Sequence, residues 1–192
     1  MNRRDALSRV ALILGGTVVG GSMFLELEGC SPADKKYGAS EKFSPEDVAY
    51  LDEIAETIIP TTNTPGAKAA QVGTFMTVMI NDCYTEKDQK AFKQGMQTLN
   101  DGAQKKYDKN FLELTPEQRK AYLNELDKEQ KAYTVDMKKD DPNHYFRMMK
   151  ELTLLGYFTS KIGATETLRY KQVPGSYDGN VPYKKGDKAW AT

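Results

Sequence analysis

Hydrophobic residues recur at helical spacing along most of the chain between residues 43 and 163. In the stretch FSPEDVAYLDEIAETIIP an apolar residue returns every three or four positions, as one buried face of an α-helix requires. Ser44 before Pro45 is a helix start, and Pro60 is a stop because proline lacks the N–H that a continuing helix needs. The buried face of this helix is expected to comprise Val48, Leu51, Ile54, Ala55 and Ile58.

A second helix is expected after a turn at Pro65 and Gly66, with its start among the small residues that follow and an apolar stretch over residues 75–80. A third helix is predicted to start at Thr85, because Thr85 and Asp88 have the spacing of a capping box. In a capping box the side chains of the N-cap residue and of the third helical residue each bond the other's backbone N–H. The buried stripe of this third helix should comprise Phe92, Met96, Leu99, Ala103 and Tyr107.

Thr115 and Gln118 repeat the capping signal before a fourth helix. The fifth helix is expected to run from about Pro142 to residue 163, and it is apolar over more than half its circumference, which is typical of a central helix. No segment alternates with period two, so we predict an all-α bundle of about five helices followed by an irregular C-terminal segment.

The C-terminal segment, residues 169–190, holds two prolines, three glycines, three tyrosines and a tryptophan. It is too irregular to form its own core, so its aromatic side chains either fold back over the helices or contact a partner. Turns are expected at Pro174–Gly175 and at Asp178–Gly179. The candidate partner-binding residues are Tyr170, Pro174, Tyr177, Asp178 and Tyr183.

Residues 1–29 have the pattern of an export signal. A basic start that includes Arg3 and Arg4 precedes 16 uncharged residues, fewer than the roughly 20 that span a bilayer comfortably. NRRDAL resembles a twin-arginine signal, which exports folded proteins, but Ala6 replaces the favoured phenylalanine and the general export route stays open.

The stretch LEGC, which ends at Cys30, resembles a bacterial lipobox, although Glu28 is unusual there. We expect the signal to be removed and lipid to be attached to Cys30; the alternatives are an uncleaved signal anchor and a plain secretory cut. Residues 30–42 would then form a polar tether, and residues 43–192 the helical domain.

The composition excludes several classes of function. The chain carries 27 basic and 27 acidic residues, and residues 1–29 contain three of each. The chain is therefore neutral with or without its export signal, and no positive field that would bind nucleic acid is expected. Two cysteines and one histidine leave little material for a metal site, and no nucleotide-binding motif occurs. Cys83 is expected to be a buried small hydrophobe, or to pair with Cys30 if Cys30 carries no lipid.

Two features of the sequence could supply catalytic groups. Asp47, Glu53 and Glu56 could form an acid cluster, but they fall at capping and solvent-facing positions of their helix. His144 could act as a general base, but no nucleophile lies near it in sequence, which favours a surface or helix-capping role. No catalytic, cofactor-binding or metal-binding residue is therefore assigned to this chain.

Two blocks, ETIIPTTNTPGAKAAQV (residues 56–72) and ELTLLGYFTSKIGATETLRYKQVPGSYDGNVPY (residues 151–183), together resemble the gluconate 2-dehydrogenase subunit 3 family. The resemblance implies an all-α accessory subunit without cofactor or catalytic residue, beside a large flavoprotein of the glucose-methanol-choline oxidoreductase type. That partner holds FAD and oxidises a sugar, sugar acid or glycoside, often with a cytochrome c as electron acceptor.

The same resemblance implies that the small subunit helps the large subunit to mature or to be exported, while lipid on Cys30 would tether the complex to a membrane facing the periplasm or cell envelope. Two alternatives remain. The protein could be a stand-alone envelope lipoprotein that binds a glycan or another envelope protein, or an enzyme that depends on His144.

Overall fold

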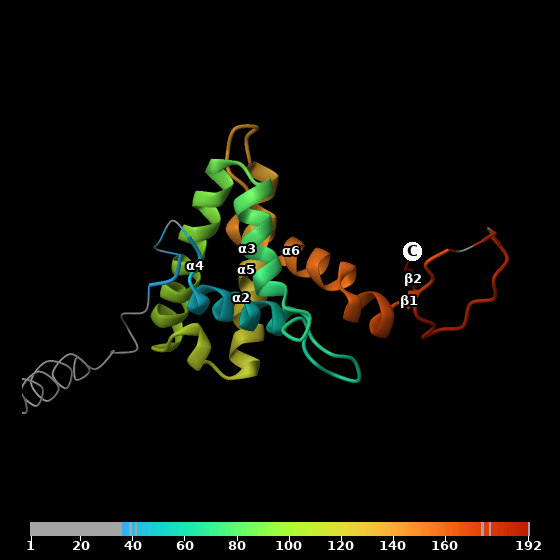
Figure 1. The fold of residues 1–192 in the computed structure, drawn as a ribbon. Helices are drawn as coiled ribbons and strands as arrows, with labels where there is room; N and C mark the ends of the chain where they lie inside the picture. The colour runs from blue at the N-terminus through green and yellow to red at the C-terminus, as the bar shows by residue number, and fades with distance from the viewer. Residues whose placement is uncertain (1–35, 39, 41, 174, 177, 192) are drawn as a thin grey trace, which may run out of the picture. The chain divides into compact units, whose positions relative to one another are not determined.

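The computed structural model describes residues 36–38, 40, 42–173, 175–176 and 178–191. Within these residues the protein is all-α, as predicted, with five α-helices (Figure 1). The export signal with Arg3 and Arg4, and the candidate lipid site Cys30, lie outside the described residues. The elements in chain order are α2 (Pro45–Ile58), α3 (Val72–Cys83), α4 (Glu86–Tyr107), η2 (Phe111–Glu113), α5 (Pro116–Asp136), α6 (Tyr145–Thr159), η3 (Gly163–Thr167), β1 (Arg169–Tyr170) and β2 (Trp190–Ala191).

Helix α2 begins and ends where the sequence predicts. The Ser44 hydroxyl accepts from the Asp47 N–H at 3.1 Å, and the Asp47 carboxylate accepts from the Ser44 N–H at 2.9 Å, which completes a capping box. The helix ends at Ile58, before Pro60. Its buried face is shifted from the prediction: it includes Tyr50, whereas Val48 and Ile58 are only partly buried.

Helix α3 begins at Val72, and the expectation that it starts among the preceding alanines is wrong. Residues 67–71 form a turn, and Gln71 takes a left-handed backbone conformation with φ of 55°. Two carboxylates of α2 hold this turn, because Glu56 accepts from the Lys68 N–H and Asp52 accepts from the Gly73 N–H. These tertiary bonds outweigh the helix propensity of alanine.

The predicted capping box forms completely on α5 but only in part on α4. Thr115 and Gln118 form the complete box on α5, with both reciprocal bonds present. Thr85 caps α4 as expected, but the Asp88 carboxylate accepts from the Thr85 hydroxyl and from the Asn143 N–H at 2.8 Å. Asp88 therefore ties the start of α4 to the segment before α6.

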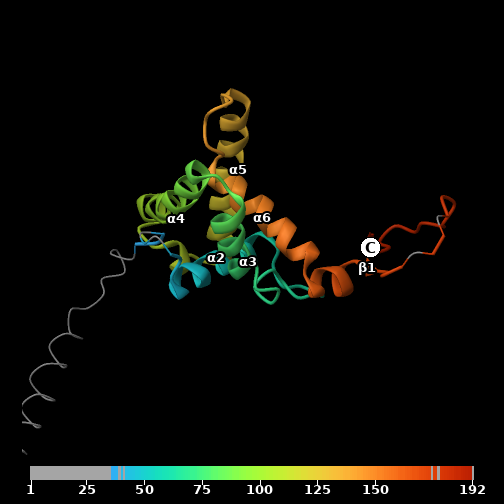
Figure 2. The ribbon, with the colours of Figure 1, turned by 45° about the horizontal axis from the view of Figure 1, so that its top comes forward.

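Helix α6 is central, as predicted, since it packs against α2, α3, α4 and α5 (Figure 2). It begins at Tyr145, three residues after the expected start, and it ends at Thr159 instead of running to residue 163. Ser160 is extended, and its hydroxyl accepts at 3.0 Å from the N–H of Gly163, the first residue of the separate short turn η3. The chain therefore changes direction before the C-terminal segment begins.

The core contains a residue from the segment that we expected to be a tether, residues 30–42. Tyr37 is buried, its ring stacks on Tyr50 with centroids 3.9 Å apart, and its N–H donates to Gln97. The Gly38 N–H donates to Asp47 at 2.7 Å.

Among the described residues, no helix combines the length and the apolar character that a membrane span requires.

Candidate partner-binding surface

The buried hydroxyl of Tyr157 connects the base of the C-terminal segment to the bundle. It donates to the Pro65 carbonyl oxygen at 2.6 Å and lies 2.7 Å from Thr167 Oγ1. A hydroxyl has one hydrogen, so with the Pro65 bond formed the Thr167 hydroxyl is the donor to Tyr157. This one side chain on α6 therefore joins the loop before α3 to η3, which brings together the two sequence blocks 56–72 and 151–183.

Glycine allows η3 to lie against the end of α6. A Cβ added at Gly163 would be 1.9 Å from the Tyr157 carbonyl oxygen, far closer than any side chain permits. A second close approach joins α3 to α6, because a Cβ at Gly156 would be 2.6 Å from the Phe75 ring. Both contacts fix where the chain leaves the helices.

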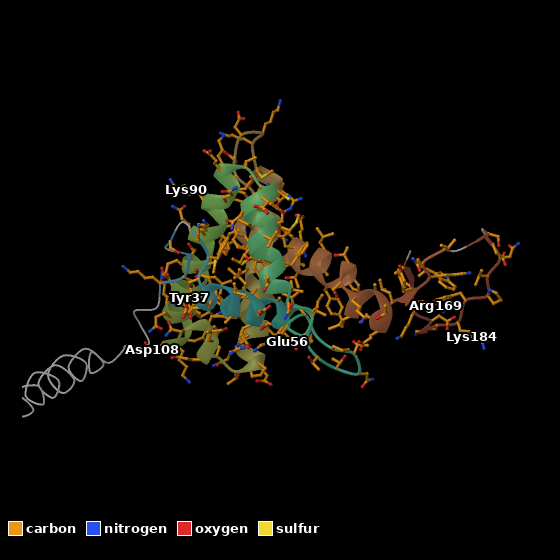
Figure 3. All side chains as sticks on the ribbon, viewed as in Figure 1. Tyr37, Glu56, Lys90, Asp108, Arg169 and Lys184 are labelled. Carbon is orange, nitrogen blue, oxygen red and sulfur yellow. The ribbon has the colours of Figure 1, made fainter. Side chains whose placement is uncertain are left out.

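Beyond η3 the chain closes on itself. The strands β1 and β2 pair in parallel, with Arg169 opposite Trp190, and two backbone hydrogen bonds of 2.8 Å hold the pair. The Arg169 guanidinium carbon lies 4.4 Å from the Trp190 ring centroid, a cation–π contact. We call residues 169–191 the C-terminal loop; Figure 3 labels Arg169 at its base and Lys184 farther along.

The aromatic side chains of the C-terminal loop do not cover the helices. Tyr170, Tyr183 and Trp190 are 49%, 76% and 52% exposed, so the alternative of a shielding tail is wrong for these three. Asp178 accepts from the Asn180 N–H at 2.9 Å, and the expected turn is present there. Pro174 and Tyr177 lie outside the described residues.

Asp47 caps its helix, as the sequence indicates, but it is buried, and Glu53 and Glu56 are only partly exposed. Asp47 is only 3% exposed and holds the Gly38 and Ser44 N–H groups. Glu56 accepts from the N–H and hydroxyl of Thr61 and from the Lys68 N–H. These carboxylates anchor the chain before and after α2, because backbone N–H groups in turns need acceptors.

Glu53 is the centre of an ion-pair network. It pairs with Lys68 and, at 2.8 Å, with Nη1 of Arg119 on α5, while Nη2 of Arg119 donates to the Leu112 carbonyl. Partial burial would raise the pKa of Glu53, but the hydrogen bonds from Lys68 and Arg119 lower it below its ordinary value. Glu53 is therefore charged at neutral pH and joins α2, the α3 turn and α5.

His144 has the capping role that the sequence favoured. Its Nδ1 accepts from the Phe146 N–H at 3.2 Å, its ring stacks on Tyr145, and its Nε2 lies 3.6 Å from Glu129. The side chain is largely buried. Burial lowers the pKa of His144, although the nearby Glu129 carboxylate opposes this.

Cys83 and the acidic side chains form no metal-binding group in the described part of the chain. Cys83 is exposed at the end of α3, which contradicts the expectation of burial. In the described ranges no group of three or more His, Cys, Asp or Glu residues could hold a metal ion. Open hollows of about 420, 210 and 480 Å³ occur at α5–α6, at α2–α5–α6 and beside Gly38, and neither His144 nor the three acids line them.

The described residues thus define an all-α protein with a closed, aromatic C-terminal loop on a fixed base. A family model described as gluconate 2-dehydrogenase subunit 3 matches residues 45–175, about two-thirds of the chain, and this protein belongs to that family. Neither the search of curated proteins nor that of solved structures gave a match.

Sequence reasoning missed Tyr157, which holds the base of this surface, and Arg119, which joins α5 to α2. A signal for Tyr157 was present, since it is a tyrosine on a helix judged to be central, and a buried tyrosine hydroxyl requires a partner. No comparable signal marked Arg119, because its partner Glu53 lies 66 residues away in sequence.

Proposed function

We propose that this protein is the non-catalytic small subunit of a dehydrogenase complex and binds the large subunit through its C-terminal loop. The observation that carries the proposal is the exposure of Tyr170, Tyr183 and Trp190 on a loop whose base is fixed by β1, β2 and Tyr157. Tyrosine and tryptophan on a restrained backbone give large contact area at low entropy cost, as binding hot spots require. Membership of the gluconate 2-dehydrogenase subunit 3 family supports a dehydrogenase as the partner.

The partner in this proposal is a flavoprotein of the glucose-methanol-choline type. It would hold FAD and oxidise a sugar, sugar acid or glycoside, and a cytochrome c would accept the electrons. The resemblance of residues 56–72 and 151–183 to the family supports this partner. The candidate catalytic groups Glu53, Glu56 and His144 instead hold the fold of this chain through ion pairs and backbone hydrogen bonds.

The complex would lie in the periplasm or cell envelope. The signal-like residues 1–29 with Arg3 and Arg4 support export, and the lipobox-like LEGC supports lipid on Cys30. A chain that folds before export could escort a folded, FAD-loaded partner through the twin-arginine route. Several acyl chains, at about 0.8 kcal/mol per buried methylene, would hold the complex at the membrane.

Affinity purification from the native host tests the proposal. Under neutral detergent, the chain should recover a flavoprotein that shows the absorption spectrum of bound flavin and oxidises a sugar or glycoside. Recovery of the chain with a glycan or another envelope protein, and with no flavoprotein, would support the stand-alone lipoprotein instead.

A further inference from the structure

The charge of this neutral chain is distributed unevenly. The C-terminal loop carries five lysine or arginine residues and two aspartates. Residues 30–192 are neutral as a whole, so residues 30–168 carry the opposite excess of three acids. Such segregation creates a local positive field in a protein without net charge.

The four lysines of the loop are exposed and form no ion pair within the described part of the chain. Lys171, Lys184 and Lys185 are exposed, and no ion pair is formed by them among the described residues. Lys188 donates to a backbone carbonyl, that of Glu166. The positive charge of the loop is therefore open to an external partner.

Both loop aspartates serve the backbone. Asp178 accepts from the Asn180 N–H, and Asp187 accepts from the Lys184 N–H at 3.0 Å. The second bond closes a turn around Gly186, whose φ of 98° favours glycine. This turn presents Lys184 and Lys185 beside Tyr183, which is more exposed than Tyr170 or Trp190.

We propose that the C-terminal loop recognises an acidic surface on the large subunit, with the lysines meeting carboxylates and the aromatic rings meeting apolar area between them. This inference rests on the proposed function and adds the chemistry of the partner's surface. Complementary charge speeds encounter and fixes orientation, and desolvated aromatic side chains supply most of the binding energy. An acidic protein surface is favoured over an anionic membrane because residues 30–168 carry an excess of three acids, which an anionic lipid surface would repel.

The chain contains a matched control for the two lysines. Lys138 and Lys139 are also adjacent and exposed, and the Lys138 N–H also donates to an aspartate three residues later, Asp141, at 2.9 Å. The double change K138E/K139E therefore alters charge in the same way, in the same kind of turn, away from the loop. Both double variants leave the buried core untouched.

The experiment measures binding of full-length chain and large subunit, co-expressed and isolated in neutral detergent through a tag on the large subunit. We expect K184E/K185E to weaken association at low salt by about tenfold or more, and K138E/K139E to change it less than about twofold. Raising salt from about 50 to 300 mM should weaken wild-type binding much more than binding of K184E/K185E, since screening acts on the charges that remain.

Three results would overturn the inference. Equal binding of the two double variants would show that the loop lysines do not contribute to recognition of the large subunit, and the proposed function would be unaffected. A loss that appears only with vesicles containing phosphatidylglycerol, and not in neutral detergent, would assign the loop to an anionic lipid. Failure of the wild-type chain to bind the large subunit at any salt concentration would reject the proposed function itself.

Discussion

At the scale of single residues, the sequence predicts capping groups well and long-range polar partners poorly. Ser44, Thr115 and His144 act within a few residues of their own position, so their roles follow from local spacing. Tyr157 bonds a carbonyl 92 residues away, and no local pattern contains that information. The fold, not the local sequence, decides which distant groups satisfy a buried polar atom.

The Tyr157 hydroxyl should stabilise the base of the loop. We expect Tyr157→Phe to lower the free energy of unfolding by about 1–2 kcal/mol, because the Pro65 carbonyl and the Thr167 hydroxyl both lose a partner. Urea denaturation followed by circular dichroism measures this. Tyr183→Phe, on an exposed ring, is the control, and equal unfolding of the two variants would contradict the assigned bonds.

His144 should make stability depend on pH. Its pKa is lower in the folded than in the unfolded protein, so the unfolded chain takes up the proton first as pH falls. The contribution is complete above the unfolded pKa of about 6.5 and is lost as pH falls towards the lower folded pKa.

His144→Asn keeps an N-cap side chain but removes the titration. Thermal unfolding between pH 7.5 and 5 should show a smaller loss of stability for the variant than for the wild type. Asp127, whose pKa is about 2 because of hydrogen bonds from Lys131 and Lys150, titrates below this window in both proteins. Parallel pH profiles would contradict the prediction.

At the scale of elements, the five helices could be predicted because each has an apolar stripe, and a local start signal marks α2, α4 and α5. The errors lie where tertiary contacts determine the backbone. Residues 67–71 form a turn because α2 carboxylates bind it, and α6 stops at Thr159 because Ser160 is extended and its hydroxyl bonds the N–H of Gly163 in η3. The pairing of β1 with β2 joins residues about 20 positions apart and has no periodic signal.

Gly163 is the element-scale residue that allows η3 to follow α6. Gly163→Ala should destabilise the protein by about 1–3 kcal/mol, because the added methyl would overlap the Tyr157 carbonyl. Chemical denaturation should show a much smaller effect for Ser176→Ala, at an exposed position of the C-terminal loop. An unchanged midpoint for Gly163→Ala would contradict the close approach.

At the scale of the whole molecule, the helices provide a scaffold and the C-terminal loop provides the surface. The fold class followed from periodicity, and the family followed from two blocks that Tyr157 brings together in space. The candidate residues Tyr170, Asp178 and Tyr183 could be chosen from sequence because aromatic residues among glycines and prolines cannot form a core. The pairing of β1 with β2, which closes the loop, could not be predicted, since strands of two residues show no alternating sequence pattern.

The proposed lipid on Cys30 gives a prediction for the whole protein. In the native host the wild type should fractionate with membranes, and Cys30→Ala should move it to the soluble envelope fraction, because only acyl chains would hold it. Intact mass of the wild type should show an acylated N-terminal Cys30. If Cys30→Ala also fractionates with membranes, the uncleaved anchor is the better account.

The central claim is that the C-terminal loop binds the flavoprotein, and deletion of residues 171–192 tests it most directly. The described part of this segment is exposed almost throughout and contributes no residue to the helices. Far-ultraviolet circular dichroism should therefore show unchanged helicity, while recovery of the flavoprotein with the truncated chain should fall strongly. Equal recovery of the flavoprotein with and without the segment, at equal helicity, would contradict the claim.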